Sequence, residues 1–236
     1  MCLVAALLAP PTAAADDTAK SRPALRVVTF NVFQDLDAAQ HRQDWLALRH
    51  RADVVLLQET EGFRVADLVA SRRWKVFQAG GDAGESAVVV RRSAVRSAGS
   101  LLVRRVLSAQ DCAGAGIGPR YLVSARLVLR NGATLRVAST HLPHAGCSNA
   151  VYHRMTTHVR AWVRHHRQRL VIGADWNRRV RSDPGRLGAT TRLSPHGVGI
   201  DGFQVDCRVR VGRASRLGHD GDWASDHEPV RVTVRP

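Results

Sequence analysis

The sequence has almost no lysine, few aromatic residues and no repetitive segment. Only Lys20 and Lys75 are lysines, and aromatic residues make up 5% of the 236 residues. The lack of heptads, collagen-like periods and long polar tracts excludes coiled-coil, fibrous and largely disordered proteins. A chain of this length with 44% hydrophobic residues can bury a core, so we expect one globular domain.

Long hydrophobic runs are also missing, and we therefore expect no transmembrane segment. The apolar run at residues 2–9 is too short to span a bilayer. The small residues 13–15 before Asp16 are typical of a signal-peptidase site, although the basic segment that usually opens a signal peptide is missing. We expect residues 1–20 to be a signal peptide or leader with a linker, residues 21–236 to form the domain, and the protein to be a secreted monomer.

Cysteines are few, and their spacing fits no zinc motif. Cys112 and Cys147 lie in glycine-containing loops, and in an exported protein we expect them to form a disulfide. Cys207 alternates with Phe203 and Val205, which predicts a buried small hydrophobic residue. The chain has neither a GxSxG motif nor a nucleophilic cysteine loop, which favours enzymes in which water attacks directly.

Negative charge is in deficit. Lys and Arg number 35 against 20 Asp and Glu, which gives a formal net charge of +15. Arginine suits phosphate groups because its planar guanidinium can bind two oxygens at once. Codon bias in a GC-rich genome would explain the arginine excess equally well. Under either explanation the surface should attract polyanions.

Short apolar segments with strand character dominate the sequence, and helical patterns lie between groups of them. The predicted strands are residues 25–32, 53–58, 74–78, 86–91, 101–107, 120–129, 134–140, 170–173, 200–211 and 229–234. The predicted helices are residues 38–50 (with Asp37 as N-cap), 62–71 and 150–166, and residues 178–199 are predicted as a loop with one helical turn. This pattern predicts a layered α/β architecture with two packed sheets and helices outside.

Polar side chains stand at the ends of several apolar strands, where a scaffold can hold catalytic groups rigidly. They are Asn31, Glu59, His141, Asp175, Asn177, Asp226 and His227. Taken singly, each has an ordinary explanation as a turn residue, a helix cap or a structural histidine. Taken together, they suit phosphodiester hydrolysis, because oxygen ligands bind Mg²⁺ or Mn²⁺ and the histidines and aspartates can transfer protons.

The motifs TFNV, QE, THL, GADWN, IDGF and SDHEPV occur in this order along residues 25–235. In order and spacing they resemble the endonuclease/exonuclease/phosphatase superfamily, which includes deoxyribonucleases of the pancreatic type, apurinic endonucleases, inositol-polyphosphate 5-phosphatases and neutral sphingomyelinases. The resemblance implies a four-layer α/β sandwich of two mixed β-sheets packed face to face, with helices outside.

The resemblance also implies a role for each matching residue. Asn31, Glu59 and Asp226 match metal-binding or metal-proximal positions, with Mg²⁺ expected and Mn²⁺ or Ca²⁺ as alternatives. The matching catalytic positions are His141, Asp175, Asn177, Asp201 and His227. Asp201 is expected to pair with an imidazole, either that of His141 or that of His227. His141, Asn177 and Arg120 are expected to contact the substrate phosphate, although Arg120 fits an exposed surface arginine equally well.

Three departures from the family pattern stand out. Ala174 separates Gly173 from Asp175, and Trp176 replaces the usual phenylalanine. Phe33 stands where apurinic endonucleases often carry an acidic residue, which argues against close kinship with them. Three functions remain open: a secreted metal-dependent nuclease acting on DNA or RNA, a phosphodiesterase or phosphatase for lipid head groups, and a non-catalytic phosphate-binding protein. The basic charge favours the first, with nucleic acid as partner.

Overall fold

The computed structural model describes residues 24–236 except 116, 183–185 and 219–222. The predicted leader at residues 1–20 lies outside the described residues. Within the described residues, no helix is both long enough and apolar enough to cross a membrane.

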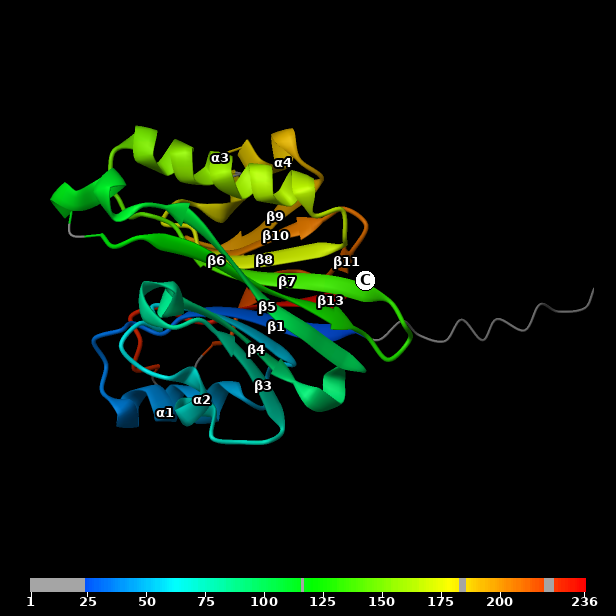
Figure 1. The fold of residues 1–236 in the computed structure, drawn as a ribbon. Coiled ribbons are helices and arrows are strands. Elements are labelled where there is room, and N and C mark those ends of the chain that lie inside the picture. The colour runs from blue at the N-terminus through cyan, green and yellow to red at the C-terminus, as the bar shows by residue number, and fades with distance from the viewer. Residues whose placement is uncertain (1–23, 116, 183–185, 219–222) are drawn as a thin grey trace, which may run out of the picture.

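Two mixed β-sheets lie face to face at the centre of the molecule (Figure 1). Sheet A contains β1 (Leu25–Asn31), β2 (Val54–Gln58), β3 (Trp74–Gln78), β4 (Ser86–Arg91), β11 (Arg210–Val211), β12 (Ser215–Arg216) and β13 (Val230–Arg235). Sheet B contains β5 (Ser97–Leu107), β6 (Arg120–Val128), β7 (Thr134–His141), β8 (Leu170–Asp175), β9 (Leu193–Val198) and β10 (Asp201–Asp206). The strand orders are β11-β13-β1-β2-β4-β3 with β12 beside β13, and β5-β6-β7-β8-β10-β9.

Helices cover the outer side of each sheet (Figure 1). Outside sheet A lie α1 (Ala38–Leu48) and α2 (Val65–Val69), and outside sheet B lie α3 (Asn149–His165) and α4 (Leu187–Thr190). Short 3-10 helices connect the strands: η1 (Gly81–Glu85), η2 (Arg92–Ala94), η3 (Ala109–Ala115) and η4 (Val180–Ser182). The layers are therefore helix, sheet, sheet and helix, which confirms the predicted four-layer sandwich.

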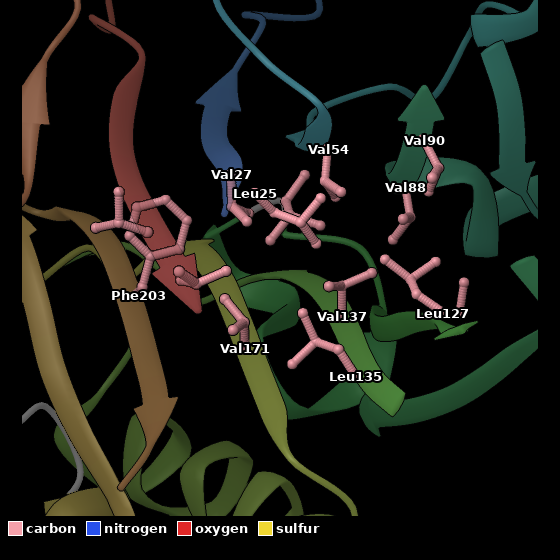
Figure 2. Close-up of a cluster of buried hydrophobic side chains, with 14 of the residues drawn as sticks. Leu25, Val27, Val54, Val88, Val90, Leu127, Leu135, Val137, Val171 and Phe203 are labelled. Carbon is pink, nitrogen blue, oxygen red and sulfur yellow. The ribbon is translucent and has the colours of Figure 1, made fainter. Parts of the chain in front are cut away.

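The central core is the apolar side-chain layer between the two sheets. Figure 2 shows Val27, Val54 and Val88 of sheet A facing Val137 and Val171 of sheet B. Central strands are apolar on both faces, because their other face packs against the helices. This explains why β2 appears in the sequence as a continuous apolar run instead of an alternating one.

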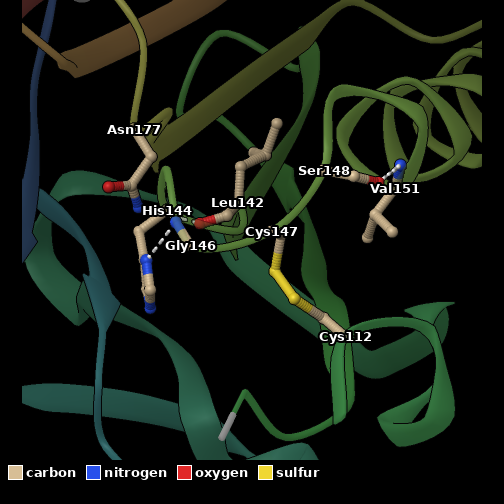
Figure 3. The surroundings of a disulfide bond; sticks show 8 residues. All are labelled: Cys112, Leu142, His144, Gly146, Cys147, Ser148, Val151 and Asn177. Atoms are coloured by element: carbon tan, nitrogen blue, oxygen red, sulfur yellow. Dashed lines mark hydrogen bonds between the residues drawn. A yellow bond between two sulfur atoms is a disulfide. The ribbon is translucent and has the colours of Figure 1, made fainter. Parts of the chain in front are cut away.

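Cys112 and Cys147 form the predicted disulfide, with Cα atoms 5.7 Å apart (Figure 3). The bond joins η3 to the loop between β7 and α3. The prediction for Cys207 is wrong: its side chain is exposed. Strand β10 ends at Asp206, so Cys207 lies in the turn beyond it instead of continuing the alternation.

The sequence missed one strand of sheet B. Residues 178–199 were predicted to be a loop with one helical turn, and they contain both that turn, α4, and strand β9. Pro195 and Gly197 within β9 hide its strand character. Both are tolerated because β9 pairs only with β10 and forms the edge of the sheet. The predicted strand at 200–211 is divided into β10 and β11.

Candidate active site

Polar residues from seven segments meet at one edge of the sandwich. Asn31, His141 and Asp175 are the last residues of β1, β7 and β8, and Arg120 and Asp201 are the first residues of β6 and β10. Glu59 follows β2 directly, and His227 lies in the loop before β13. Strand direction explains the convergence, because the end of a strand and the start of its antiparallel neighbour share an edge.

Sheet B holds three of these residues in one row. In the strand register, Asp175 of β8 pairs with His141 of β7 on one side and with Asp201 of β10 on the other. The side chains of paired residues lie on the same face of a sheet. The backbone ladder therefore places two carboxylates and an imidazole side by side before any loop contributes.

Sheet A contributes the amide of Asn31 and the carboxylate of Glu59. Asn31 Nδ2 donates to Glu59 Oε1 at 2.7 Å and, across the gap between the sheets, to Asp175 Oδ2 at 3.3 Å. The Asn31 side-chain oxygen accepts from the Phe33 backbone N–H at 3.0 Å. Asn31 is thus the group that connects the carboxylates of the two sheets.

Two imidazoles face the same oxygen of Asp175. His141 Nε2 lies 3.4 Å and His227 Nε2 lies 3.7 Å from Asp175 Oδ2. Each imidazole has a second carboxylate at its Nδ1. Asp201 Oδ2 is 2.9 Å from His227 Nδ1, and Glu85 Oε1 is 3.3 Å from His141 Nδ1. Asp201 therefore pairs with His227 and not with His141, a question that the sequence left open.

Glu85 is a site residue that the sequence analysis missed. It precedes β4, is 2% exposed, and lies between His141 and Arg120, whose Nη1 is 3.6 Å away. In the sequence it lies in the glycine-containing stretch GDAGES, before the amino end of β4, and shows no sign of a site. Strand β4 runs antiparallel to β2, so its amino end reaches the same edge. Arg120 is also buried, which contradicts the alternative of an exposed surface arginine.

The charges of these groups depend on one another. Burial alone lowers the pKa of His141, but Asp175 and Glu85 outweigh burial and raise it to about 9. Burial likewise lowers the pKa of His227, and Asp201 and Asp175 raise it to about 9. Burial raises the pKa of Asp175, but the two imidazoles outweigh that effect and leave it lowered. At neutral pH an ionised Asp175 therefore lies between two protonated imidazoles.

The backbone is left-handed beside the site. Phe33, Glu59 and Asn177 have φ values of 54°, 58° and 49°, a region that residues other than glycine seldom adopt. Glu59 Oε2 accepts from the Gln34 backbone N–H at 3.2 Å. Asn177 N–H donates to Asp175 Oδ1 at 2.8 Å. These hydrogen bonds stabilise backbone conformations that are unfavourable by themselves. Such strained conformations are common at functional sites.

Asn177 connects the row in sheet B to the disulfide-bonded loop. Its Nδ2 donates to the Leu142 carbonyl at 2.8 Å and lies 3.1 Å from His141 Nε2. In Figure 3, Asn177 and Leu142 lie beside the loop that carries Cys147. The disulfide thus fixes the segment that supports both His141 and Asn177.

Asp226 is placed differently from the other predicted ligands. Its side chain is 64% exposed, and its carboxylate lies 4.0 Å from His227 Nε2. The preceding Ser225 is buried, and its hydroxyl donates to the Asn31 carbonyl at 2.8 Å. Asp226 therefore lies at the outer rim of the site, and its role as a metal ligand stays a prediction.

The donor set suits a hard divalent cation. Four carboxylates, those of Glu59, Glu85, Asp175 and Asp201, lie near one arginine and two imidazoles. Even with both imidazoles protonated, these carboxylates outnumber the cationic groups by one. Carboxylate oxygens of Asp175 and Asp201 lie within 4.8 Å of each other, and Asn31 bridges Glu59 and Asp175. Oxygen donors with residual negative charge are what Mg²⁺ and Mn²⁺ require.

Comparison with known proteins gives the class. The model of the Endonuclease/Exonuclease/phosphatase family matches residues 28–232, and the chain belongs to this family. No match was found among curated proteins.

Solved structures share the fold. An endonuclease/exonuclease/phosphatase from Bacteroides vulgatus is 16% identical, with a TM-score of 0.70 over 89% of this chain and 98% of that chain. TDP2 of D. rerio, solved with a single-strand DNA product, is 17% identical, with a TM-score of 0.69 over 90% and 99%. A mannosyl-6-phosphatase of Bacteroides thetaiotaomicron is 15% identical, with a TM-score of 0.66 over 89% and 99%. At these identities the likeness establishes the fold alone.

Proposed function

We propose that this chain is a metal-dependent phosphodiester hydrolase that cleaves nucleic acid by direct attack of water. The observation that carries the proposal is the pair of imidazoles around Asp175, each backed by its own carboxylate. Such a site has two cationic donors for a phosphate and one carboxylate between them. The family includes hydrolases of phosphate esters of several kinds, so the substrate class is argued from the surface of this chain.

The proposed roles follow from charge and position. Asp175 is ionised and accepts the proton of the attacking water, which it also orients. His141, Asn177 and Arg120 donate to phosphate oxygens, and His227 donates to the oxygen that carries the developing charge. Asp201 and Glu85 keep the two imidazoles charged and fix their orientation.

A divalent cation would be held by Glu59 beside the Asn31 amide, with Asp226 at the rim. When bound, it would neutralise charge on the phosphate and stabilise the leaving oxygen. Glu59 suits this role because its Oε1 and Oε2 are oriented by Asn31 and by the Gln34 N–H. Both bonds fix the carboxylate without neutralising it.

Nucleic acid is favoured over lipid head groups for two reasons. The net charge of +15 attracts a polyanion. Among the described residues, the exposed large hydrophobic side chains are Leu46, Leu101 and Leu102, and none of them is aromatic. A lipid-directed enzyme would be expected to expose aromatic side chains for insertion at the membrane interface.

A substrate panel tests the proposal. Purified protein is incubated with plasmid DNA, single-stranded DNA, RNA, sphingomyelin vesicles and phosphoinositide vesicles, each with Mg²⁺, Mn²⁺ or Ca²⁺ and with chelator. We expect cleavage of a nucleic acid that depends on a cation and stops with chelator. Cleavage of a lipid alone would support the head-group alternative, and no cleavage of any substrate would support a phosphate-binding protein.

A further inference from the structure

A basic hollow lies next to the site, at the end of the edge strand of sheet B. It has a volume of about 510 Å³ and is lined by Arg104, Arg105, Arg154 and His158. Asp111 is the carboxylate that lines it, and within the described residues it faces three arginines. The site residues Glu59, Asp175 and His227 do not line this hollow, so it is a separate feature of the surface.

The strand register places the hollow beside Arg120. On β5, Leu107 pairs with Arg120, Arg105 with Tyr121 and Arg104 with Leu122. With adjacent strands ~4.8 Å apart and a rise of ~3.4 Å per residue, the Cα atoms of Arg105 and Arg104 lie about 6 Å and about 8 Å from that of Arg120. A strand of nucleic acid whose phosphate contacts Arg120 therefore has its neighbouring phosphates within reach of the hollow.

The walls of the hollow are held in place by other contacts. Asp111 accepts from the backbone N–H and the hydroxyl of Ser108 at 2.9 and 2.8 Å, and Arg154 forms an ion pair with Asp111. His158 Nδ1 lies 2.9 Å from the Val106 carbonyl and donates to it. The Cys112–Cys147 disulfide joins the two segments that carry these groups. Arg104 and Arg105 are exposed on β5, and no carboxylate is paired with either of them in the described residues.

The chemistry of the hollow fits a single strand. Helix α3, which carries Arg154 and His158, contains no acidic residue. Leu101 and Leu102, on the same strand as the arginines, are 36% and 38% exposed. A single strand offers both phosphates for the guanidinium groups and unstacked bases for apolar surface and guanidinium planes, whereas a duplex buries its base faces.

We propose that Arg104, Arg105 and Arg154 form a subsite that binds the phosphates of a single-stranded polynucleotide extending from the catalytic centre over Arg120 and β5. The inference rests on the proposed function, since it assumes that the strand is the substrate. It adds the path of the strand over the surface, and it names the residues that bind phosphates other than the one that reacts.

Binding without cleavage tests the subsite. Fluorescence anisotropy of a labelled 20-nucleotide single strand is measured with chelator present, at several salt concentrations, for wild type, Arg104→Ala/Arg105→Ala and Arg154→Ala. Arg164→Ala is the matched control, because Arg164 is exposed on the same helix but does not line the hollow. We expect the double variant to bind about tenfold more weakly, with the slope of log K against log salt reduced by about 1.4, about 0.7 for each arginine on a single strand. The control should change Kd less than twofold.

Hydrolysis of bis(p-nitrophenyl) phosphate with Mg²⁺ separates the two proposals. Weaker binding of the single strand by the double variant supports the subsite. If wild type also hydrolyses no phosphodiester, the proposed function is wrong but the subsite is still supported. Cleavage of single strands by wild type, together with an unchanged Kd and salt slope in both hollow variants, overturns the subsite and leaves the function standing. An equal loss of strand binding in Arg164→Ala also overturns it.

Discussion

At the scale of single residues, the site depends on buried charges that no short motif contains. Glu85 is the clearest case, since its carboxylate lies 3.3 Å from His141 and 3.6 Å from Arg120 and is almost fully buried. It keeps one imidazole charged and fixes one arginine. Its position before β4, in the glycine-rich stretch GDAGES, resembles an ordinary turn in the sequence.

Glu85→Gln should reduce catalysis more than stability. The amide keeps the size of the side chain but removes the charge that His141 and Arg120 share. We expect kcat to fall about 10- to 100-fold, the range typical of groups that orient a catalytic residue. The measurement is kcat for phosphodiester cleavage together with Tm. A variant with the wild-type kcat would show that Glu85 has no part in the site.

Gly173 lets the two sheets approach each other beneath the site. A Cβ at this position would lie 2.6 Å from Leu56 Cδ1 and 3.0 Å from Thr29 Cβ. Gly173→Ala should therefore cost about 1–3 kcal/mol of the free energy of unfolding, the usual penalty for overpacking a core. Urea denaturation of this variant is compared with that of Gly80→Ala, where nothing lies within 4 Å of the added carbon. Equal stability of the two variants would contradict this account of the packing.

At the scale of elements, helix α1 holds the loop that carries His227. Asp44 of α1 is 2% exposed, and it accepts from the backbone N–H groups of Ala224 and Ser225 at 2.8 and 3.1 Å. Ser225 in turn donates to the Asn31 carbonyl and accepts from the His227 N–H at 3.1 Å. The position of the imidazole therefore depends on a helix that does not itself face the reacting groups.

Asp44→Ala should lower kcat about 10- to 100-fold, because small displacements of catalytic groups are costly. The same change should cost about 1–3 kcal/mol of stability, since two buried N–H groups lose their acceptor. Asp44→Asn keeps one acceptor oxygen and should restore most of the rate. If Asn restores stability without restoring kcat, the helix does not position the loop.

The ion pairs of Asp206 with Arg208 and Arg192 make part of the free energy of unfolding depend on pH. Burial raises the pKa of Asp206 at the end of β10, but bonds from Arg208 and Arg192 outweigh burial and leave that pKa below its ordinary value of 3.8. The unfolded state, with the ordinary pKa, binds the proton more readily. The stabilisation is therefore complete well above pH 3.8 and is lost as pH falls toward the lower pKa of the folded state.

Asp206→Asn should test this assignment. At pH 7 we expect the free energy of unfolding to fall by about 3 kcal/mol, because two arginines lose a buried partner. As pH falls below the ordinary pKa of 3.8, the difference between variant and wild type should shrink, because the unfolded wild type binds a proton that the folded protein binds only at lower pH. Urea denaturation at several pH values measures it, and a difference that does not change with pH would contradict the assignment.

The elements that sequence patterns predict best are those buried on both faces, and edges and turns are predicted least well. Strands β2 and β8 are nearly continuous apolar runs, β1 is rich in β-branched residues, and the bounds of all three lie within two residues of those predicted. Strand β9 was missed because an edge strand tolerates proline and glycine. The prediction for Cys207 failed because an apolar alternation cannot show where a strand ends.

At the scale of the whole molecule, most of the site was accessible from the sequence because strand ends converge in this fold. The structure brings Asn31, Glu59, His141, Asp175, Asn177, Asp201 and His227 together, and the role of each stays a prediction. What sequence could not supply is the pairing between them, because Asp201 and His227 become neighbours only through the folding of β10 and the last loop. The metal role of Asp226 and the secreted location stay predictions.

The central claim is that Asp175 and the two imidazoles form a hydrolytic centre that requires a divalent cation. The most direct measurement is the rate of cleavage of a single-stranded oligonucleotide with Mg²⁺ and with chelator, for wild type, Asp175→Asn and His141→Ala, with Tm measured for each protein. We predict that chelator abolishes cleavage and that each variant loses at least about a thousandfold in rate at near-wild-type Tm. Cleavage by either variant at the wild-type rate, or cleavage unaffected by chelator, would contradict the claim.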